Sequence, residues 1–518
     1  MRIKSSTKHR RIEEDHSMQE YAAIPIELKV EHNIERIRLD LGESDDVVIR
    51  EIRFEGAESA NGAVVYIDGM SDATIINNYI FDVLERSLNG IYRGEPADGE
   101  KKSALTKDLL FGIGSIHTVS EMGSLYKNML SGEAVILLAG SGQAYCADIR
   151  QWKGRDVTES TNQTSVRGPR ESFTETLRVN TALIRRKIKD PQLRLETSSI
   201  GRNTMTDVTM MYMKGIAKPS VIDLARSRLK SIDIDSVLDS GYIEEMIEDG
   251  KYSLFPTVYN TELPDNAAAQ LLEGKVAILV DGTPNVLLVP TQFVTFFQST
   301  EDYYQRAFYA SLLRLLRFSS VFISLLFPSL YIAITTFHRD MLPASLLISL
   351  AAQREGVPFP AFIEALIMEI TFEILREAGL RMPRAIGQAV SVVGTLVIGQ
   401  AAVEAGIVSA AMVIVVSITA ISTFTLPAYS MTIPIRILRF LFMGAAASFG
   451  LFGIIMGMFV LILHMCALRS FGESYLSPFA PYRATELKDT LVRLPRWLSF
   501  KRPSTSMGQG GKRLRKRW

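Results

Sequence analysis

Four long segments without a formally charged residue occupy the C-terminal half of this chain, and they constrain its fold more than any other feature. They span residues 318–337, 385–403, 405–435 and 440–463. A helix needs about 20 apolar residues to cross the hydrocarbon core of a bilayer, and within that core only helices and closed barrels satisfy their own backbone polar groups. The sequence therefore predicts an α-helical polytopic membrane domain behind a large water-facing head.

Positive charge at both ends of the chain predicts the orientation of this domain. The first eleven residues hold five Lys or Arg, and residues 493–518 hold nine with no acid among them. Lys and Arg beside membrane spans mark the cytoplasmic side. We therefore expect the head and the tail in the cytoplasm and an even number of crossings, which four spans supply. Residues 341–352 are short for a span and are expected to be interfacial or re-entrant.

The head contains an internal repeat. A strand-like segment that ends in a Gly turn at residues 63–70 recurs at 208–216, and a second one at 132–141 recurs at 274–283. The same order at similar spacing predicts two related α/β domains, although apolar strands before Gly turns also recur by coincidence. Helices are expected at 173–188, 220–229 and 236–248.

The expected domain organisation follows from these patterns. It consists of a basic N-terminal tail at 1–27, a first soluble α/β domain at 28–155, a linker at 156–169, a second soluble α/β domain at 170–304, a transmembrane helical domain at 305–470 and a basic C-terminal tail at 471–518. The fold class is thus tandem α/β soluble domains followed by a helical membrane domain. The last eight residues also fit a nucleic-acid-binding tail, but beside a membrane span anionic lipid is the favoured partner, and no nucleic acid is expected.

Acidic residues near the membrane are the first candidates for function. Three of them follow one another at i,i+4 spacing on a largely apolar helix: Glu369, Glu373 and Glu377. Acids at membrane depth are costly, so these face either ion-pair partners or an ion pathway. The candidate partners are Arg376, Arg381 and Arg384.

A second acidic candidate lies between two predicted spans. Glu404, with Gln400 one helical turn before it, either caps a helical hairpin at the headgroups or forms a ring in a symmetric oligomer. Acidic rings select cations in channels. The candidate ion pathway therefore contains both residues beside the three acids above.

Small residues in two of the spans predict close helix packing. They are Gly387, Ser391 and Gly394 in one span and Gly450, Gly453 and Gly457 in another. Such faces let helix backbones approach closely, either within one chain or between copies.

No pattern of catalytic or metal-binding residues emerges. The six histidines, at positions 9, 16, 32, 117, 338 and 464, are not spaced as metal ligands, and the two cysteines are too few for a disulfide framework. A glycine-rich phosphate-binding loop is absent from the sequence. We therefore expect no enzyme activity, no metal and no cofactor.

Seven stretches distributed along the chain together resemble the A subunits of bacterial spore-germination nutrient receptors. They are residues 42–52 (GESDDVVIREI), 166–175 (VRGPRESFTE), 272–284 (LEGKVAILVDGTP), 298–304 (QSTEDYY), 357–360 (VPFP), 375–379 (LREAG) and 397–409 (VIGQAAVEAGIVS). Each is weak alone, but their order is highly specific, and the resemblance covers about residues 30–495. The first thirty residues and the tail after Pro503 depart from the family pattern.

The resemblance implies a multi-pass subunit of a germinant receptor in the spore inner membrane, assembled with a transporter-like B subunit and a lipoprotein C subunit. In this family the B subunit is thought to bind the nutrient, and the A subunit to oligomerise into an ion-conducting pore. We therefore expect this chain to form a homo-oligomer that converts nutrient sensing into ion release. A non-conducting scaffold or signal-relay subunit is the alternative, and a secondary transporter is less favoured because repeated broken helices are missing.

Overall fold

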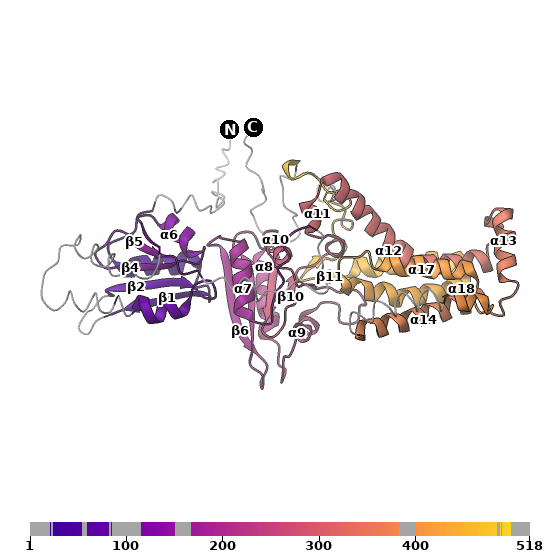
Figure 1. Cartoon of the computed structure of the whole chain (residues 1–518), viewed down its shortest axis with the longest axis horizontal. Helices are drawn as coiled ribbons and strands as arrows, with labels where there is room; N and C mark the ends of the chain where they lie inside the picture. Colours follow the sequence, from indigo (N-terminus) through magenta and orange to yellow (C-terminus); the bar gives the residue numbers. More distant parts are fainter. Residues whose placement is uncertain are drawn as a thin grey trace, which may run out of the picture. The chain divides into compact units, whose positions relative to one another are not determined.

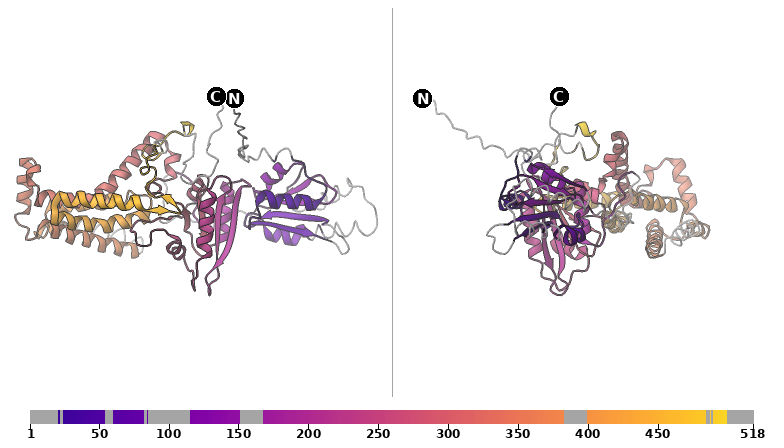
Figure 2. Two further views of the ribbon diagram at one scale, coloured as in Figure 1. Left: turned by 180° about the vertical axis from the view of Figure 1, so that it is seen from behind. Right: turned by 60° about the vertical axis from the view of Figure 1, so that its left-hand side comes forward.

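The computed structural model describes residues 21, 24–53, 60–81, 84, 115–150, 167–382, 399–483, 487 and 489–498. These residues form two compact units. The head unit comprises the described residues up to Glu248 together with Asn260–Pro290, and the helical unit comprises Asp249–Tyr259 and Thr291–Leu498. Figure 1 and Figure 2 show two sheets in the former and long helices in the latter. The predicted linker lies almost entirely outside the described residues, and the predicted domain limits stay a prediction.

The first sheet has five antiparallel strands in the order β1-β2-β4-β5-β3. They are β1 (Val47–Ile52), β2 (Gly62–Ile67), β3 (Ile116–Val119), β4 (Ala134–Leu138) and β5 (Ala144–Ala147). Strands β2, β4 and β5 are buried along their whole length, which explains their continuous apolar sequence. Helices α2 (Val30–Leu41) and α6 (Met122–Met129) cover one face, and the short α3 (Ala73–Ile75) and η1 (Ile76–Ile80) contribute to the core on the other.

The second sheet repeats this topology, in the order β6-β7-β9-β10-β8. Its strands are β6 (Leu193–Ile200), β7 (Thr206–Met213), β8 (Tyr259–Thr261), β9 (Val276–Val280) and β10 (Val286–Val289), and its helices are α7 (Leu177–Lys187), α8 (Pro219–Lys230), α9 (Ser240–Ile247) and α10 (Pro264–Leu271). The two repeated segments correspond to β2 and β7 and to β4 and β9, which occupy equivalent places in the two sheets. The prediction of tandem α/β domains is confirmed, and α7, α8 and α9 lie at the three expected helices.

One asparagine fixes the start of the equivalent helix in each domain. Asn33 is the fourth residue of α2; its side chain accepts from the backbone N–H of Glu27 at 3.0 Å and donates to the carbonyl oxygen of Glu27 at 2.7 Å. Asn180 is the fourth residue of α7 and makes the same pair of bonds with Thr174, at 2.7 and 2.5 Å. Both side chains are buried, and buried amides need such partners.

A buried ion pair connects the two α/β domains. Arg185 of α7 donates to Asp46 through Nε at 2.7 Å and through Nη2 at 3.0 Å, and both side chains are 1% exposed. Ser44 accepts from Nη2 of Arg185 and from the backbone N–H of Leu195, both at 3.0 Å. A bidentate arginine–carboxylate pair is directional as well as strong. The GESDD sequence at residues 42–46 thus has a structural role at this junction.

The helical unit contains most of the predicted membrane domain. Its main helices are α12 (Ala307–Thr336), α13 (Ala344–Arg354), α14 (Ala361–Arg381), α16 (Gly399–Glu404), α17 (Ala410–Thr423) and α18 (Tyr429–Ala467). Helix α12 packs against α14, α17 and α18, and these four helices lie side by side in Figure 1. Among the described helices, α12 and α18 are long and apolar enough to be candidate membrane spans. Residues 341–352, which we expected to be interfacial or re-entrant in the membrane, belong mostly to α13, and no residue of α13 is buried.

Two of the four predicted spans are not continuous helices. The segment 405–435 is interrupted between α17 and α18, and the segment 440–463 is interrupted at Gly450, where φ is 59°. A Cβ on Gly457 would lie 2.7 Å from Cε1 of Phe442, although a straight helix would separate these positions by about 20 Å. Helix α18 is therefore a hairpin with a first arm at 429–449 and a second arm at 451–467. The predicted segment 318–337 lies largely in α12, and 385–403 lies mostly outside the described residues.

The chain enters and leaves the bundle at the same end. Ser470, just after the second arm of α18, donates to the carbonyl oxygen of Thr257 at 2.7 Å and accepts from the backbone N–H of Thr291 at 2.8 Å. Further on, a carboxylate oxygen of Asp489 accepts from the hydroxyl of Tyr303 at 2.9 Å. Residues that precede the bundle thus pack against residues that follow it.

Candidate functional site in the helix bundle

Charged side chains lie inside the helix bundle, and apolar side chains cover its outside. Arg439 and Glu369 have side chains only 2% and 0% exposed. Phe449, Phe452 and Phe459 of α18 are instead 58–65% exposed. This arrangement is the reverse of a water-soluble protein and is typical of helices whose outer surface faces lipid or another chain.

Arg439 in the first arm of α18 is the centre of a network that links four helices. Its Nη1 donates to Oε2 of Glu369 on α14 at 2.6 Å, and its Nε donates to the carbonyl oxygen of Ser324 on α12 at 2.8 Å. Its Nη2 donates to the hydroxyl oxygens of Ser324 and of Thr423 on α17, at 3.1 and 3.2 Å. A buried guanidinium is tolerated only when its donors are paired. The network therefore fixes α12, α14, α17 and α18 against one another.

Two more acids of α14 are paired on either side of this network. Glu373 makes a bidentate pair with Arg436, whose Nε donates at 2.9 Å. Glu364 is fully buried and accepts from Nε of Arg354 at 3.2 Å and from the backbone N–H of Ser409 at 3.1 Å. Ser409 is the N-cap of α17, so this carboxylate lies at the positive end of a helix. We define the charged core as Glu364, Glu369 and Glu373 with Arg354, Arg436 and Arg439.

The structure separates the predicted ion-pathway residues into two groups. Glu369 and Glu373 belong to the charged core, and Glu377 lies beyond it in an exposed pair with Arg381, at 2.8 Å. On α16, Nε2 of Gln400 donates to Oε1 of Glu404 at 2.9 Å in an exposed position. Within the described residues, no hydrogen bond or ion pair joins this α16 pair to the charged core. A common role of these five residues in an ion pathway stays a prediction.

The acids of α14 have ion-pair partners, but mostly not the expected ones. Of the three predicted partners, Arg381 pairs with Glu377, Arg376 lies over the rings of Phe424 and Tyr429 at 5.1 and 6.0 Å, and Arg384 is outside the described residues. The sequence analysis missed Arg436 and Arg439, which separate the third and fourth uncharged segments. Their i,i+3 spacing puts them on one helix face and was the available signal.

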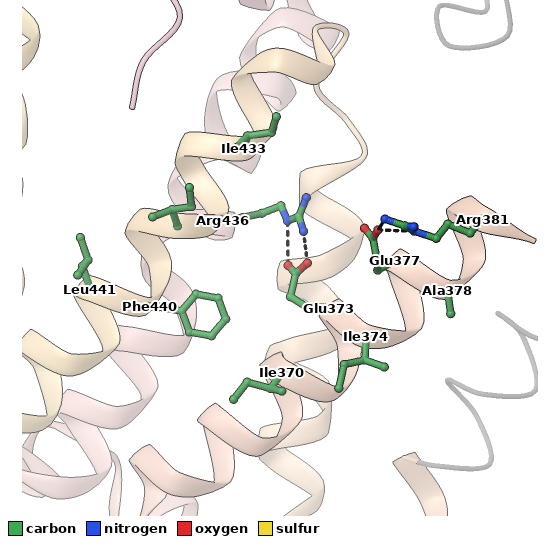
Figure 3. Close-up of a pocket in the computed structure, with 11 residues that line it drawn as sticks. Ile370, Glu373, Ile374, Glu377, Ala378, Arg381, Ile433, Arg436, Phe440 and Leu441 are labelled. Atoms are coloured by element: carbon green, nitrogen blue, oxygen red, sulfur yellow. Dashed lines mark hydrogen bonds and ion pairs between the residues drawn. The ribbon is translucent and has the colours of Figure 1, made fainter. Parts of the chain in front are cut away.

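An open groove of about 950 Å³ lies between α14 and the first arm of α18. Figure 3 shows Glu373 and Arg436 extending toward each other across it. Its lining residues are Ile370, Glu373, Ile374, Glu377, Ala378 and Arg381 from α14 and Ile433, Arg436, Ile437, Phe440 and Leu441 from α18. The groove thus presents a mainly apolar surface with an ion pair at its centre.

The predicted helix-packing glycines that the structure describes act within the hairpin of α18. A Cβ on Gly453 would clash with the carbonyl oxygen of Ala445, and one on Gly457 would clash with the ring of Phe442, so these two glycines let the two arms approach closely. A Cβ on Gly450 would instead lie 2.8 Å from Cε1 of His338, just after the end of α12. The other predicted packing residues, Gly387, Ser391 and Gly394, lie outside the described residues.

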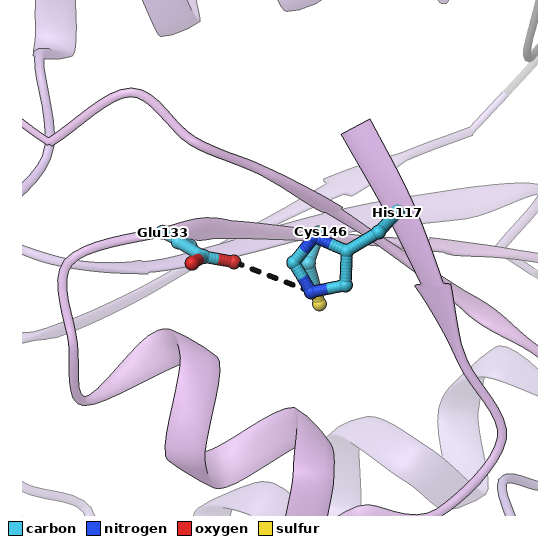
Figure 4. A group of neighbouring side chains, drawn as sticks. All are labelled: His117, Glu133 and Cys146. Atoms are coloured by element: carbon cyan, nitrogen blue, oxygen red, sulfur yellow. Dashed lines mark ion pairs between the residues drawn. The ribbon is translucent and has the colours of Figure 1, made fainter. Parts of the chain in front are cut away.

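Among the residues that the structure describes, one group of potential metal ligands lies in the head. The described residues bring His117, Glu133 and Cys146 together in the first sheet, as Figure 4 shows. Sequence spacing did not reveal this group, because its members belong to or adjoin three different strands.

Comparison with known proteins identifies the family. The family model described as Bacillus/Clostridium GerA spore germination protein matches residues 35–505. The chain belongs to the GerA family. Spore germination protein KA of Bacillus subtilis is 46% identical to this GerA-family chain over 475 residues, which cover 91% of this chain and 86% of that protein. The uncharacterized membrane protein YfkQ of Bacillus subtilis is 45% identical over 489 residues, which cover 94% of this chain and 93% of that protein.

A solved structure matches the N-terminal half of this GerA-family chain. It is the N-terminal domain of the A subunit of the Bacillus megaterium spore germinant receptor GerK3, at 35% identity and a TM-score of 0.41, and the match covers 52% of this chain and 97% of that one. The family inferred from the seven sequence stretches is confirmed. Membership of the GerA family supports a role in a germinant receptor.

Proposed function

We propose that this GerA-family chain is the A subunit of a germinant receptor and converts a nutrient signal into ion release across the spore inner membrane. It acts together with a transporter-like B subunit, which binds the nutrient, and a lipoprotein C subunit. The chain itself catalyses no reaction. Its head and its C-terminal tail lie in the cytoplasm, and its bundle lies in lipid.

The observation that carries this proposal is the inverted bundle. A buried Glu369–Arg439 pair inside helices with exposed phenylalanines is unsuited to water, because both the interior and the surface would be unfavourable there. In lipid the exposed side chains find an apolar solvent, and the charges stay paired away from it. The entry and exit of the chain at one end of the bundle supports the shared location of head and tail.

The charged core gives the bundle a closed state that a signal can change. Arg439 connects α12, α14 and α17, so a movement of α18 has to break or exchange several hydrogen bonds together. Such an arrangement favours two discrete states over gradual deformation. A signal from a partner subunit opens the bundle if that partner binds the open state more tightly than the closed state.

Oligomerisation supplies the ion pathway in this proposal. The described interior of one bundle is occupied by paired charges, so an ion path forms between copies of the chain. Gln400 and Glu404 are exposed and bonded to each other, which leaves them free to face an axis shared by several copies. A ring of Glu404 carboxylates would then favour cations.

Conductance of the assembled receptor in lipid vesicles tests this proposal. Nutrient should open a cation conductance in the complete receptor, and Glu404→Gln should lower its selectivity for cations over anions. Glu377→Gln is the matched control, because it neutralises an exposed acid on α14 and should leave selectivity unchanged. Unaltered selectivity in Glu404→Gln would remove this residue from the pathway.

A non-conducting scaffold is the second candidate, and the ion pairs of Glu369 with Arg439 and of Glu373 with Arg436 favour it. In that case the acids only hold the bundle together, and the chain relays a movement between partners. The mass of the detergent-solubilised subunit separates the two, since a pore built between copies requires an oligomer and a scaffold functions as a monomer. No cation current from an assembled, nutrient-responsive receptor would favour the scaffold.

A further inference from the structure

An imidazole, a thiol and a carboxylate meet at one edge of the first sheet. His117 on β3 and Cys146 on β5 are directly opposite each other in the antiparallel register, and Glu133 immediately precedes β4. One ligand atom from each residue lies within 4.8 Å of the other two, and Nε2 of His117 is 3.7 Å from Oε2 of Glu133. Figure 4 shows the three side chains directed toward one another.

These distances are close to those around a tetrahedral metal ion. Zinc binds nitrogen and oxygen at about 2.0–2.2 Å and sulfur at about 2.3 Å, so neighbouring ligand atoms lie roughly 3.3–3.8 Å apart. The His117–Glu133 distance already fits this range. The remaining separations are at most 4.8 Å and need a contraction of no more than about 1–1.5 Å, which side-chain rotation provides.

The buried carboxylate of Glu133 has an ion-pair contact with His117 at 3.7 Å but no hydrogen bond at its Oε2 among the described residues. Glu133 is 7% exposed, and its Oε2 accepts no hydrogen bond from any residue that the structure describes. A buried charged group without partners is costly, so such groups are paired or coordinate a metal. A bound dication would stabilise the ionised carboxylate of Glu133 and the ionised thiol of Cys146.

The fold itself does not demand this group. In the second domain, Lys275 takes the place of Glu133 directly before β9, and Leu288 takes the place of Cys146 as the third residue of β10. The same topology therefore forms with a cation and an apolar side chain at these positions. The acid and the thiol of the first domain call for an explanation beyond packing.

We propose that the first sheet binds one Zn²⁺ ion through Nε2 of His117, Oε2 of Glu133 and Sγ of Cys146, with water as the fourth ligand. A mixed nitrogen, oxygen and sulfur set selects zinc over Mg²⁺ and Ca²⁺, which prefer oxygen alone. Thiolate and carboxylate together balance the charge of the ion, and their protons go to solvent on binding. His117 has a side chain 46% exposed, which gives the ion an entry path.

Asn128 of α6 adjusts when the ion binds. Its Nδ2 lies 2.8 Å from Nε2 of His117 and 3.5 Å from Sγ of Cys146, the two atoms that would ligate zinc. A donor in this position competes with the metal for their lone pairs, so the amide turns aside on binding. Asn128→Ala removes the competitor and should bind the metal as tightly as the parent or more tightly.

Cobalt titration of the full-length chain in detergent tests the site. Cys466→Ser serves as the parent, because it leaves Cys146 as the only thiol. Reduced, metal-free parent protein should bind one Co²⁺ with a thiolate-to-cobalt charge-transfer absorption that Zn²⁺ displaces and excess Mg²⁺ or Ca²⁺ does not. Cys146→Ser should lose the absorption, and His117→Gln and Glu133→Gln should weaken binding at least tenfold.

A second measurement keeps the proposal falsifiable if Cys146→Ser does not fold. In the parent, Zn²⁺ should slow alkylation of Cys146 at least tenfold relative to chelator, and it should have little effect in Glu133→Gln. Equal alkylation rates with zinc and with chelator would overturn the proposal. So would the absence of a charge-transfer band in folded parent protein, or an equal zinc affinity in the parent and in the Glu133 variant.

Discussion

Removing the carboxylate of Glu369 should strongly destabilise the helix bundle. Glu369→Leu would leave the guanidinium of Arg439, which is 2% exposed, without its acidic partner. Breaking a buried ion pair by removing one partner costs about 3–5 kcal/mol, because the remaining charge stays buried. At about 2–4 °C per kcal/mol for a unit of this size, the melting temperature should fall by roughly 10 °C.

The double variant distinguishes this explanation from a loss of packing. In Glu369→Leu/Arg439→Leu no charge stays buried at this position, so the bundle should recover most of the lost stability and lie within about 1–2 kcal/mol of the parent. Glu377→Leu is the matched control on α14, because its pair with Arg381 is exposed and worth less than about 1 kcal/mol.

Thermal unfolding of the full-length protein in one detergent, followed by circular dichroism, measures these three variants together with the single variant Arg439→Leu. The reasoning is refuted if Glu369→Leu melts within two or three degrees of the parent. It is also refuted if the double variant is as unstable as the sum of its single changes, since additivity would mean that the two side chains do not interact.

Three further predictions concern other parts of the chain. Arg185→Met should lower the free energy of unfolding by about 3–5 kcal/mol, because the buried carboxylate of Asp46 loses its cationic partner. The double variant Arg185→Met/Asp46→Leu should lower it much less, and denaturant unfolding of the head measures both variants. Burial and, to a smaller extent, the charge of Glu248 raise the pKa of Glu244 to about 7. The folded state therefore favours the protonated acid, and its free energy of unfolding falls as the pH rises from about 4.5 to above 7. Glu244→Gln should remove this loss, which is worth up to about 3 kcal/mol, in thermal melts recorded across that pH range. Gly457→Leu should open the hairpin of α18 and lower the melting temperature, unlike Gly444→Leu, where a Cβ meets open space.

The sequence predicts the head more completely than the bundle. Apolar strands followed by Gly turns at 63–70 and 208–216 marked equivalent strands of two sheets, because strands buried on both faces have a continuous apolar sequence. The buried asparagines that start α2 and α7 repeat the same interaction at the same helix position, but no periodic pattern marks them. Their role depends on a loop geometry that single-residue propensities do not contain.

In the bundle, the lack of charged residues predicted apolar helices, but it did not predict where the chain turns between them. Gly450 reverses the chain inside one uncharged segment, and a glycine there is indistinguishable by composition from those at 453 and 457. The sequence placed Glu369 and Glu373 on one helix face, but their partners Arg439 and Arg436 lie some sixty residues away and meet them only through tertiary packing. The group of His117, Glu133 and Cys146 was missed for the same reason.

Cysteine labelling of sealed membrane vesicles tests the central claim, that the bundle spans lipid with its entry and exit on one face. In a chain with Cys146→Ala and Cys466→Ser, single cysteines would replace Tyr252 before the bundle, Tyr482 after it and Met341 beyond the far end of α12, all of which are exposed. Positions 252 and 482 should react with a membrane-impermeant reagent from the same side, and position 341 from the other. Labelling of 252 and 482 from opposite sides would contradict the account.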